Sequence, residues 1–198
     1  MKLGLAGTTV VVSSGDDGVA SFDTDPEPIG CLGPNSTVFN PSFLATCPYV
    51  LAVGATQLVN CTSDATATCP EVASTDFGSG GGFSNVFPRP SYQADAVKGY
   101  LNSTQFGFTG YSGESVGTGV FNTTGRGFPD VSAIGENFVI AYWSSFGTIG
   151  GTSLSAPIWA GLLTRVNEAR LAAGKKTVGF VNPTLVRVFL PKRVMIAG

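Results

Sequence analysis

The pattern of apolar and polar residues divides the chain into short strands, loops and one long helix. The β-branched run at residues 8–12 and the apolar run at 49–54 are typical of buried strands, and residues 137–143 predict another strand. Within residues 158–173, apolar side chains recur at helical spacing with polar residues between them, and Gly174 ends the pattern. We therefore expect an α/β fold.

Loops rich in glycine, proline, serine and threonine connect these runs. Five prolines and little periodicity predict a long loop at residues 21–48. Residues 58–72 are expected to form a shorter loop, and residues 102–127 are polar and glycine-rich, which also indicates a loop. Neither of the two local cysteine pairs has the C-x-x-C spacing of a zinc or redox site, so each is expected to close its own loop as a disulfide. The pairs are Cys31 with Cys47 and Cys61 with Cys69.

A serine with small neighbours stands directly before the helical segment, in GGTSLSAP at residues 150–157. Small neighbours let a substrate backbone approach Ser153, and free N–H groups at a helix start favour the negative charge that develops during attack. Pro157 is compatible with the first helical turn, where N–H groups have no helical partner. These features indicate a nucleophile at Ser153. A Ser/Thr cap on a buried helix explains the same residues without chemistry.

Two further segments carry candidate chemistry. Asp16, in SSGDDG at residues 13–18, follows the strand at 8–12, and catalytic groups of open α/β sheets lie beyond the carboxyl ends of strands. A Gly-Asp turn is the alternative for Asp16. The glycine run in FGSGGGFS at residues 77–84 lacks the Lys-Ser/Thr ending of a phosphate-binding loop, and suits either a backbone that an extended peptide can approach or a flexible loop. Asp130 stands alone in a turn and is interpreted as a structural carboxylate.

Composition narrows the classes of function. Hydrophobic residues make up 43% of the 198 residues and charged residues 12%, and the net charge of −2 without a basic cluster argues against a nucleic acid partner. No apolar run reaches the roughly 18 residues that a membrane helix needs. The chain has no histidine, which excludes a Ser-His-Asp mechanism carried by this chain alone and a zinc site built on imidazole. The base of a nucleophilic serine would then be a carboxylate or a lysine, and a carboxylate predicts an acidic optimum.

Four N-x-S/T sequons and an even number of cysteines indicate a protein made on the secretory route. An N-linked glycan is expected at each sequon asparagine. These residues are Asn35, Asn60, Asn102 and Asn122.

Several segments, in order, resemble the sedolisin family of serine-carboxyl peptidases. The segment GTSLSAP by itself resembles subtilisin-like serine peptidases. The resemblance implies a subtilisin-like three-layer fold with a mainly parallel central sheet flanked by helices. It also implies a Ser-Glu-Asp triad, which agrees with the missing histidine. The segments are SSGD at 13–16, SGGGFSNVFPRPSYQ at 79–93, RGFPDV at 126–131, GTSLSAP at 151–157 and GFVNP at 179–183.

The resemblance implies roles for particular residues. Ser153 matches the nucleophile. Asp16 matches the aspartate of the oxyanion hole, where a protonated carboxyl donates a hydrogen bond to the tetrahedral oxyanion. That role requires a protonated side chain at the working pH, which acid conditions favour. A substrate-facing strand of the family, which pairs with the peptide main chain, is matched by Ser79, Gly80, Gly81 and Gly82.

The other functional parts of the family are expected outside these residues. Residues 1–5 resemble the end of the helix that carries the glutamate base and its aspartate partner, so both are expected before residue 1. The calcium site of the family follows the Asn-Pro motif, and no acidic ligand set follows Glu168, so calcium is expected to bind beyond this chain. We therefore expect a partial sedolisin catalytic domain at residues 1–185, truncated at both ends, and a divergent tail at 186–198.

The predicted function is hydrolysis of peptide bonds at acidic pH, by an endopeptidase or a tripeptidyl-peptidase. The expected partner is a peptide or protein substrate, with no nucleic acid, no membrane and no second copy, and the family's propeptide is absent. The chain alone is expected to be inactive without its base. The alternative is an inactive pseudopeptidase that keeps a peptide-binding groove. The expected location is extracellular or an acidic, lysosome-like compartment.

Overall fold

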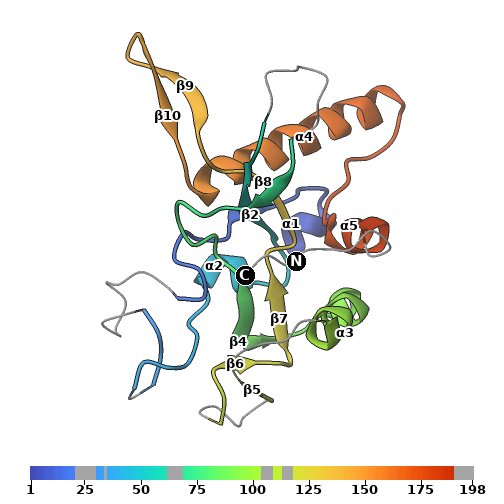
Figure 1. Cartoon of the computed structure of the whole chain (residues 1–198). Coiled ribbons are helices and arrows are strands. Elements are labelled where there is room, and N and C mark those ends of the chain that lie inside the picture. Colours follow the sequence, from blue (N-terminus) through green and yellow to red (C-terminus); the bar gives the residue numbers. More distant parts are fainter. Residues whose placement is uncertain (21–29, 34, 62–68, 104–108, 113–117, 190–198) are drawn as a thin grey trace.

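A small mixed sheet forms the centre of the molecule (Figure 1). Strands β1 (Val11–Ser13) and β8 (Val131–Ile134) each run parallel to β2 (Leu51–Leu58). The short strand β3 (Glu71–Ala73) pairs antiparallel with the end of β2. The structure is a computed structural model, and it describes residues 1–20, 30–33, 35–61, 69–103, 109–112 and 118–189.

Helices cover both faces of this sheet, which confirms the predicted three layers. On one face, Leu51 and Val53 pack against the long helix α4 (Thr152–Ala172). On the opposite face, Ala52 packs near the short helix α2 (Phe43–Thr46). Successive side chains of a strand point to opposite faces, so the continuous apolar run of β2 is buried on both sides. The fold is therefore α/β with a mainly parallel sheet at its centre.

A second group of elements lies on the side of the sheet away from α4 (Figure 1). It has its own apolar core around Phe83, Val97 and Phe121, all buried. The predicted loop at residues 102–127 contains several strands of this group, each too short to produce a periodic pattern in the sequence. The elements are β4 (Gly82–Pro88) paired antiparallel with β7 (Gly125–Phe128), β5 (Gly110–Tyr111) paired parallel with β6 (Phe121–Asn122), the 3-10 turn η1 (Ser91–Gln93) and helix α3 (Ala94–Ser103).

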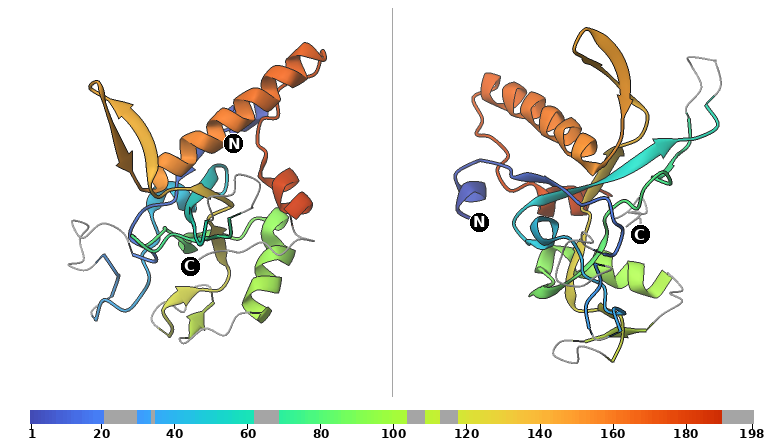
Figure 2. Two further views of the ribbon diagram at one scale, coloured as in Figure 1. Left: turned by 45° about the horizontal axis from the view of Figure 1, so that its top comes forward. Right: turned by 90° about the vertical axis from the view of Figure 1, so that its left-hand side faces the viewer.

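An antiparallel hairpin of β9 (Phe138–Tyr142) and β10 (Ser145–Ile149) projects from the body near the start of α4 (Figure 2). Trp143 and Ser144 form its turn with positive φ angles of 47° and 62°, as a two-residue hairpin turn of type I′ requires. The strand predicted at 137–143 is confirmed as β9. The second strand was not predicted, because serine and glycine interrupt its apolar pattern.

Two segments far apart in the sequence lie side by side near the end of α4. Helix α1 (Lys2–Leu5) is followed by Gly7, whose φ of 92° is typical of the residue after a helix, as the sequence predicted. Thr177 Oγ1 donates to Gly7 O at 2.8 Å and ties the two segments together. The chain then enters α5 (Asn182–Phe189), so the predicted limit after residue 185 falls inside a helix. Most of the predicted tail, residues 190–198, lies outside the described residues.

The apolar stripe that predicts the long helix consists of Ile158, Leu162, Leu163 and Val166, and α4 buries only part of it. Leu163 packs against the sheet together with Ala156, whereas Ile158, Leu162 and Val166 are exposed. The helix begins at Thr152, before the predicted start, so residues assigned to the preceding loop supply part of the contact face. None of the helices that the structure describes has the length and apolar character needed to cross a bilayer.

One of the two expected disulfides is formed. Cys61 and Cys69 are bonded, whereas Cys31 and Cys47 are free thiols. Cys47 directly follows α2 and lies beside Tyr92. Cys31 adjoins the small β-bridge of Leu32 and Val38, in a segment joined to the second group of strands. The prediction of a Cys31–Cys47 disulfide is therefore contradicted, because the two cysteines are held by different parts of the fold.

The four sequon asparagines have different surroundings. Asn35, Asn60 and Asn102 are exposed, so a glycan on each stays a prediction. Asn122 is buried, its Nδ2 donates to Ser84 O at 3.1 Å, and its Oδ1 accepts from Thr124. A glycan attaches at that nitrogen, so the structure contradicts Asn122 as a glycosylation site.

Candidate active site

Ser153 lies in the first turn of α4 with its side chain exposed to solvent. The prediction that this serine stands at a helix start is confirmed. Pro157 lies in the second turn, because the helix begins at Thr152, so its predicted place in the first turn is wrong. Proline has no N–H, and the missing donor is the one that would bind the carbonyl of Ser153 inside the helix. The backbone around the exposed hydroxyl therefore lacks one helical bond.

The carboxyl of Asp16 is bound to the residue that precedes Ser153. Thr152 donates twice to Asp16 Oδ1, from its backbone N–H at 2.7 Å and from Oγ1 at 2.8 Å. Thr152 Oγ1 also accepts from the N–H of Gly15 at 3.1 Å. These bonds join segments 136 residues apart in the sequence and engage Oδ1, not Oδ2. The structure thus brings the two predicted catalytic residues to one corner of the fold.

A glycine is required where the chain enters α4 at this corner. Gly151 has a φ of 118°, a conformation that other residues rarely adopt. A Cβ atom on Gly151 would lie 3.0 Å from Asp16 Oδ2, so a side chain would also press on the carboxyl. Both constraints explain the small residue before Thr152.

The glycine segment at residues 78–81 pairs with the loop that carries Asp16. The N–H of Gly18 donates to Gly78 O at 2.8 Å, that of Gly80 to Gly15 O at 2.7 Å, and that of Gly81 to Gly18 O at 3.1 Å. Ser79 Oγ accepts from the N–H of Ala55 at 2.9 Å. The substrate-pairing role of Ser79–Gly82 stays a prediction. The N–H groups of Gly80 and Gly81 are used here to hold the Asp16 loop.

Replacing Gly80 with alanine is expected to destabilise this corner by about 1–3 kcal/mol. A Cβ atom at Gly80 would lie 2.1 Å from the backbone oxygen of Ser14, and backbone cannot move aside as a side chain can. The matched control is Gly99→Ala in α3, where nothing lies within 4 Å and alanine is the better helix former, so stability is expected to rise by about 0.5–1 kcal/mol. Urea unfolding measures both, and equal effects would contradict the close approach at Gly80.

Glu136 is a buried acidic residue near this corner that sequence analysis did not select. Its Oε1 accepts from Ser74 Oγ and from the backbone N–H groups of Thr75, at 2.7 Å, and Asp76, at 3.0 Å. The neighbouring Gly135 accepts from the N–H of Gly151 at 2.8 Å, so the segment contacts the entrance to α4. Its position directly after the carboxyl end of β8 was the signal in the sequence that could have identified it.

Hydrogen bonding keeps Glu136 ionised in mild acid. Burial alone would raise the pKa of Glu136, but the donors on Ser74, Asp76 and Thr75 outweigh it and hold that pKa below its ordinary value. The folded-state pKa is therefore lower than that of an unfolded glutamate, about 4.3. The stability that this group contributes is fully present above the unfolded value and is lost as the pH falls through the lower folded value.

Asp130 is structural, as the sequence predicted. Its carboxylate accepts from the N–H of Ala52 at 2.8 Å and from Gln93 Nε2 at 3.1 Å, and it forms an ion pair with Arg126. Both side chains of the pair are fully buried. Arg126 also donates to Gly127 O and Val50 O, so this network joins β7 to β2.

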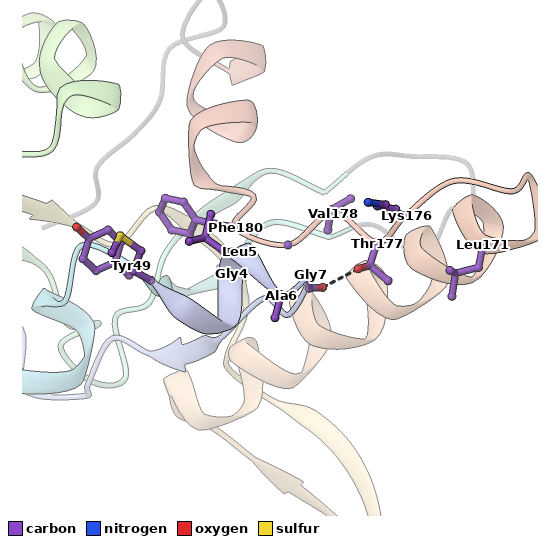
Figure 3. Close-up of a pocket in the computed structure, with 12 residues that line it drawn as sticks. Gly4, Leu5, Ala6, Gly7, Tyr49, Leu171, Lys176, Thr177, Val178 and Phe180 are labelled. Carbon is purple, nitrogen blue, oxygen red and sulfur yellow. Dashed lines mark hydrogen bonds between the residues drawn. The ribbon is translucent and has the colours of Figure 1, made fainter.

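The structure also contains a cavity far from Ser153. A cavity of about 780 Å³ lies between α1, the end of α4 and the segment that leads to Phe180 (Figure 3). Leu171 in its wall is 18 residues along α4 from Ser153, roughly 27 Å at 1.5 Å per residue.

The described part of the chain contains no group of three or more acidic, cysteine or histidine side chains that could hold a metal ion. Calcium binding stays a prediction.

Known proteins match this chain in sequence. A family model described as Subtilase family matches residues 3–186. Tripeptidyl-peptidase sed1 of Aspergillus fumigatus is 49% identical over 195 residues, covering 93% of this chain and 29% of that protein. Aorsin of Aspergillus oryzae is 44% identical over 197 residues, covering 94% of this chain and 30% of that protein. The chain thus spans less than a third of the length of these relatives.

A solved structure matches this chain in fold. It is Pseudomonas sedolisin, a serine-carboxyl proteinase complexed with two molecules of pseudo-iodotyrostatin. The TM-score is 0.65 and the sequence identity 25%, over 96% of this chain and 45% of that one. The likeness therefore covers nearly all of the chain.

Proposed function

Because this chain belongs to the subtilase family, in its sedolisin group of serine-carboxyl peptidases, we propose that the corner at Ser153 hydrolyses peptide bonds in acid. The observation that carries the proposal is the pair of hydrogen bonds from Thr152 to Asp16, which hold a carboxyl group beside an exposed serine. The name of the relative from Aspergillus fumigatus, tripeptidyl-peptidase sed1, favours a tripeptidyl-peptidase, which removes three residues from a free N-terminus.

In the proposed reaction, Ser153 Oγ attacks the carbonyl carbon of the scissile bond and loses its proton to a carboxylate base. By the family resemblance this base is a glutamate, oriented by an aspartate, and neither is expected within these 198 residues. The carbonyl oxygen becomes an oxyanion and accepts a hydrogen bond from protonated Asp16. Since Thr152 engages Oδ1, Oδ2 is the oxygen that would carry this proton.

The tetrahedral intermediate then collapses. The C–N bond breaks, the amine leaves with the proton that the base had taken, and the acyl group stays on Ser153 Oγ. Water attacks this ester with the same carboxylate as base, and the acid product leaves. The base must be ionised to accept the proton of Ser153, so the rate is expected to decline at very low pH.

An assay of the longest reading frame that contains these residues tests the proposal. Peptides with free and with blocked N-termini are incubated with the purified protein from pH 3 to 8, and the products are identified by mass spectrometry. Release of tripeptides from the free N-terminus in acid is the expected result, and internal cuts in both peptides would instead indicate an endopeptidase. Peptides that bind but stay intact at every pH would contradict catalysis and favour the alternative, a peptide-binding pseudopeptidase.

We also propose an extracellular or acidic, lysosome-like location. The Cys61–Cys69 disulfide and the exposed sequon asparagines Asn35, Asn60 and Asn102 support it, because both features belong to proteins of the secretory route. Mass spectrometry of the protein from the culture medium, before and after removal of N-glycans, gives the occupancy of each site. Asn122 is expected to stay unmodified.

Replacing Asp16 with alanine is expected to lower kcat by about 10²- to 10³-fold, because the donor to the oxyanion is removed. The matched control is Asp17→Ala, whose side chain is exposed on the same loop and is expected to change kcat less than about twofold. Steady-state kinetics at the acidic optimum measure both variants. A kcat for Asp16→Ala within threefold of the parent protein would contradict the oxyanion role.

A further inference from the structure

The corner that holds Ser153 is built from a closed series of contacts, and Glu136 lies where the series closes. The series links segments from both halves of the chain through hydrogen bonds and short stretches of backbone. It runs from Glu136 to the turn at residues 74–76, to the glycine segment at 78–81, to the loop at 15–18, to Thr152 through Asp16, and from Gly151 back to Gly135.

The first link fixes the turn before the glycine segment. Three donors of the turn converge on Glu136 Oε1, namely Ser74 Oγ and the N–H groups of Thr75 and Asp76. In the amide orientation that gives both of its polar atoms a partner, Gln57 Nε2 donates to Oε2 at 3.1 Å. Both oxygens of one buried carboxylate are thus engaged, and hydrogen bonds to an ionised acceptor are the strong ones.

The second link connects the turn at residues 74–76 to the loop that carries Asp16. Gly78 lies two residues after Asp76, and from there the glycine segment makes the three bonds to the loop at residues 15–18 described above. The same loop is also bound to Thr152, whose Oγ1 accepts from the N–H of Gly15. A shift of the turn at 74–76 would therefore move the carboxyl of Asp16.

The third link connects the segment of Gly135 and Glu136 to the backbone just before Ser153. Gly135 donates from its N–H to Thr56 O at 2.8 Å and accepts from the N–H of Gly151 at 2.8 Å. Gly151 is two residues before Ser153. The segment of Gly135 and Glu136 thus contacts the Asp16 side of the corner through Glu136 and the Ser153 side through Gly135.

From this geometry we infer that Glu136 is a positioning residue for peptide hydrolysis, which fixes the Asp16 loop relative to Ser153 through the turn at residues 74–76. The inference rests on the proposed function for its catalytic consequence. Both carboxylate oxygens of Glu136 already accept hydrogen bonds from the protein. Glu136 therefore acts through the loops and not on the substrate. Misplacing a reacting or stabilising group by about 1 Å costs on the order of 10²-fold in rate.

The first test is kinetic and compares Glu136→Gln with the matched control Glu168→Gln. Glutamine is similar in size but carries no charge, so its carbonyl oxygen accepts hydrogen bonds from the turn more weakly than the carboxylate does. We expect kcat to fall about 10-fold or more for Glu136→Gln while KM stays within about twofold, because binding is kept and alignment is lost. Glu168 is exposed on α4 and paired with Arg165, and its variant is expected to match the parent protein.

The second test needs no activity and uses amide hydrogen exchange on the same proteins. If Glu136 positions the corner, exchange in Glu136→Gln rises in peptides that cover residues 15–18, 74–81 and 151–153, and stays unchanged in α3 and β7. An unchanged pattern at the corner, or an unchanged kcat, would overturn the inference. Faster exchange throughout the protein with a lower Tm would also overturn it, since that indicates a general structural role.

The two tests separate failure of this inference from failure of the proposed function. If the parent protein hydrolyses no peptide, the proposed function fails, and the exchange pattern still decides whether Glu136 holds the Asp16 loop against the start of α4. If the parent protein is active and the exchange at the corner does not respond to Glu136→Gln, the proposed function stands and the positioning role is wrong.

Discussion

Replacing Ser153 with alanine is expected to lower kcat for peptide hydrolysis by roughly 10⁴- to 10⁶-fold, because no other group replaces a lost nucleophile. The fold is expected to stay unchanged. Ser153 is exposed in the first turn of a 21-residue helix, and alanine is the best helix former. Single-turnover assays at the acidic optimum measure the rate, and thermal unfolding measures the stability.

A serine two residues further along α4 provides the matched control. Ser155 is buried, and its hydroxyl donates to the carbonyls of Ala133 and Ile134 at the end of β8. Ser155→Ala is expected to cost about 1 kcal/mol of stability, because two buried acceptors lose their donor, and to keep most of the activity. If Ser155→Ala were inactive and Ser153→Ala active, the nucleophile would be misassigned.

Replacing Arg126 with methionine is expected to destabilise the protein by about 3–5 kcal/mol. The change leaves the Asp130 carboxylate fully buried without its cation, and it removes the donors to Gly127 O and Val50 O. Such a loss is a large part of the 5–15 kcal/mol that stabilises a typical domain. Urea unfolding of the variant is the measurement, with the midpoint and the slope both recorded.

The exposed pair of Arg165 and Glu168 on α4 gives the comparison for Arg126. Its side chains are 78% and 64% exposed, so water and salt screen the attraction. Arg165→Ala is expected to change stability by less than about 1 kcal/mol. Equal losses for Arg126→Met and Arg165→Ala would contradict the view that the buried pair holds β7 to β2.

Sequence patterns predicted the parts of the fold that depend on local chemistry. Gly7 ends a helix, residues 49–54 begin a buried strand, and Ser153 stands at a helix start, all as expected. These features follow from backbone conformation and from apolar runs, which are properties of neighbouring residues. The three-layer arrangement came from the family resemblance and not from periodicity.

The sequence could not predict features that depend on contacts between distant residues. The face that α4 buries is set by where the helix begins on the sheet, so Ile158, Leu162 and Val166 are exposed although they belong to the predicted stripe, and only its member Leu163 is buried. Asn122 has a valid sequon, but only the fold shows that Ser84 O occupies its amide. Glu136 is one acidic residue among several in the sequence, and its three donors come from a turn 60 to 62 residues earlier.

The bond between Asp16 and Thr152 also governs when a newly made chain could become reactive. It closes a loop of 136 residues, for which chain entropy alone costs about 4 kcal/mol, so it forms only after the sheet has assembled between its ends. At the usual rates of synthesis, roughly 7 to 27 s separate the translation of these two residues. Throughout that interval a nascent chain holds no complete corner, so the proposed hydrolysis is not expected to begin on the ribosome.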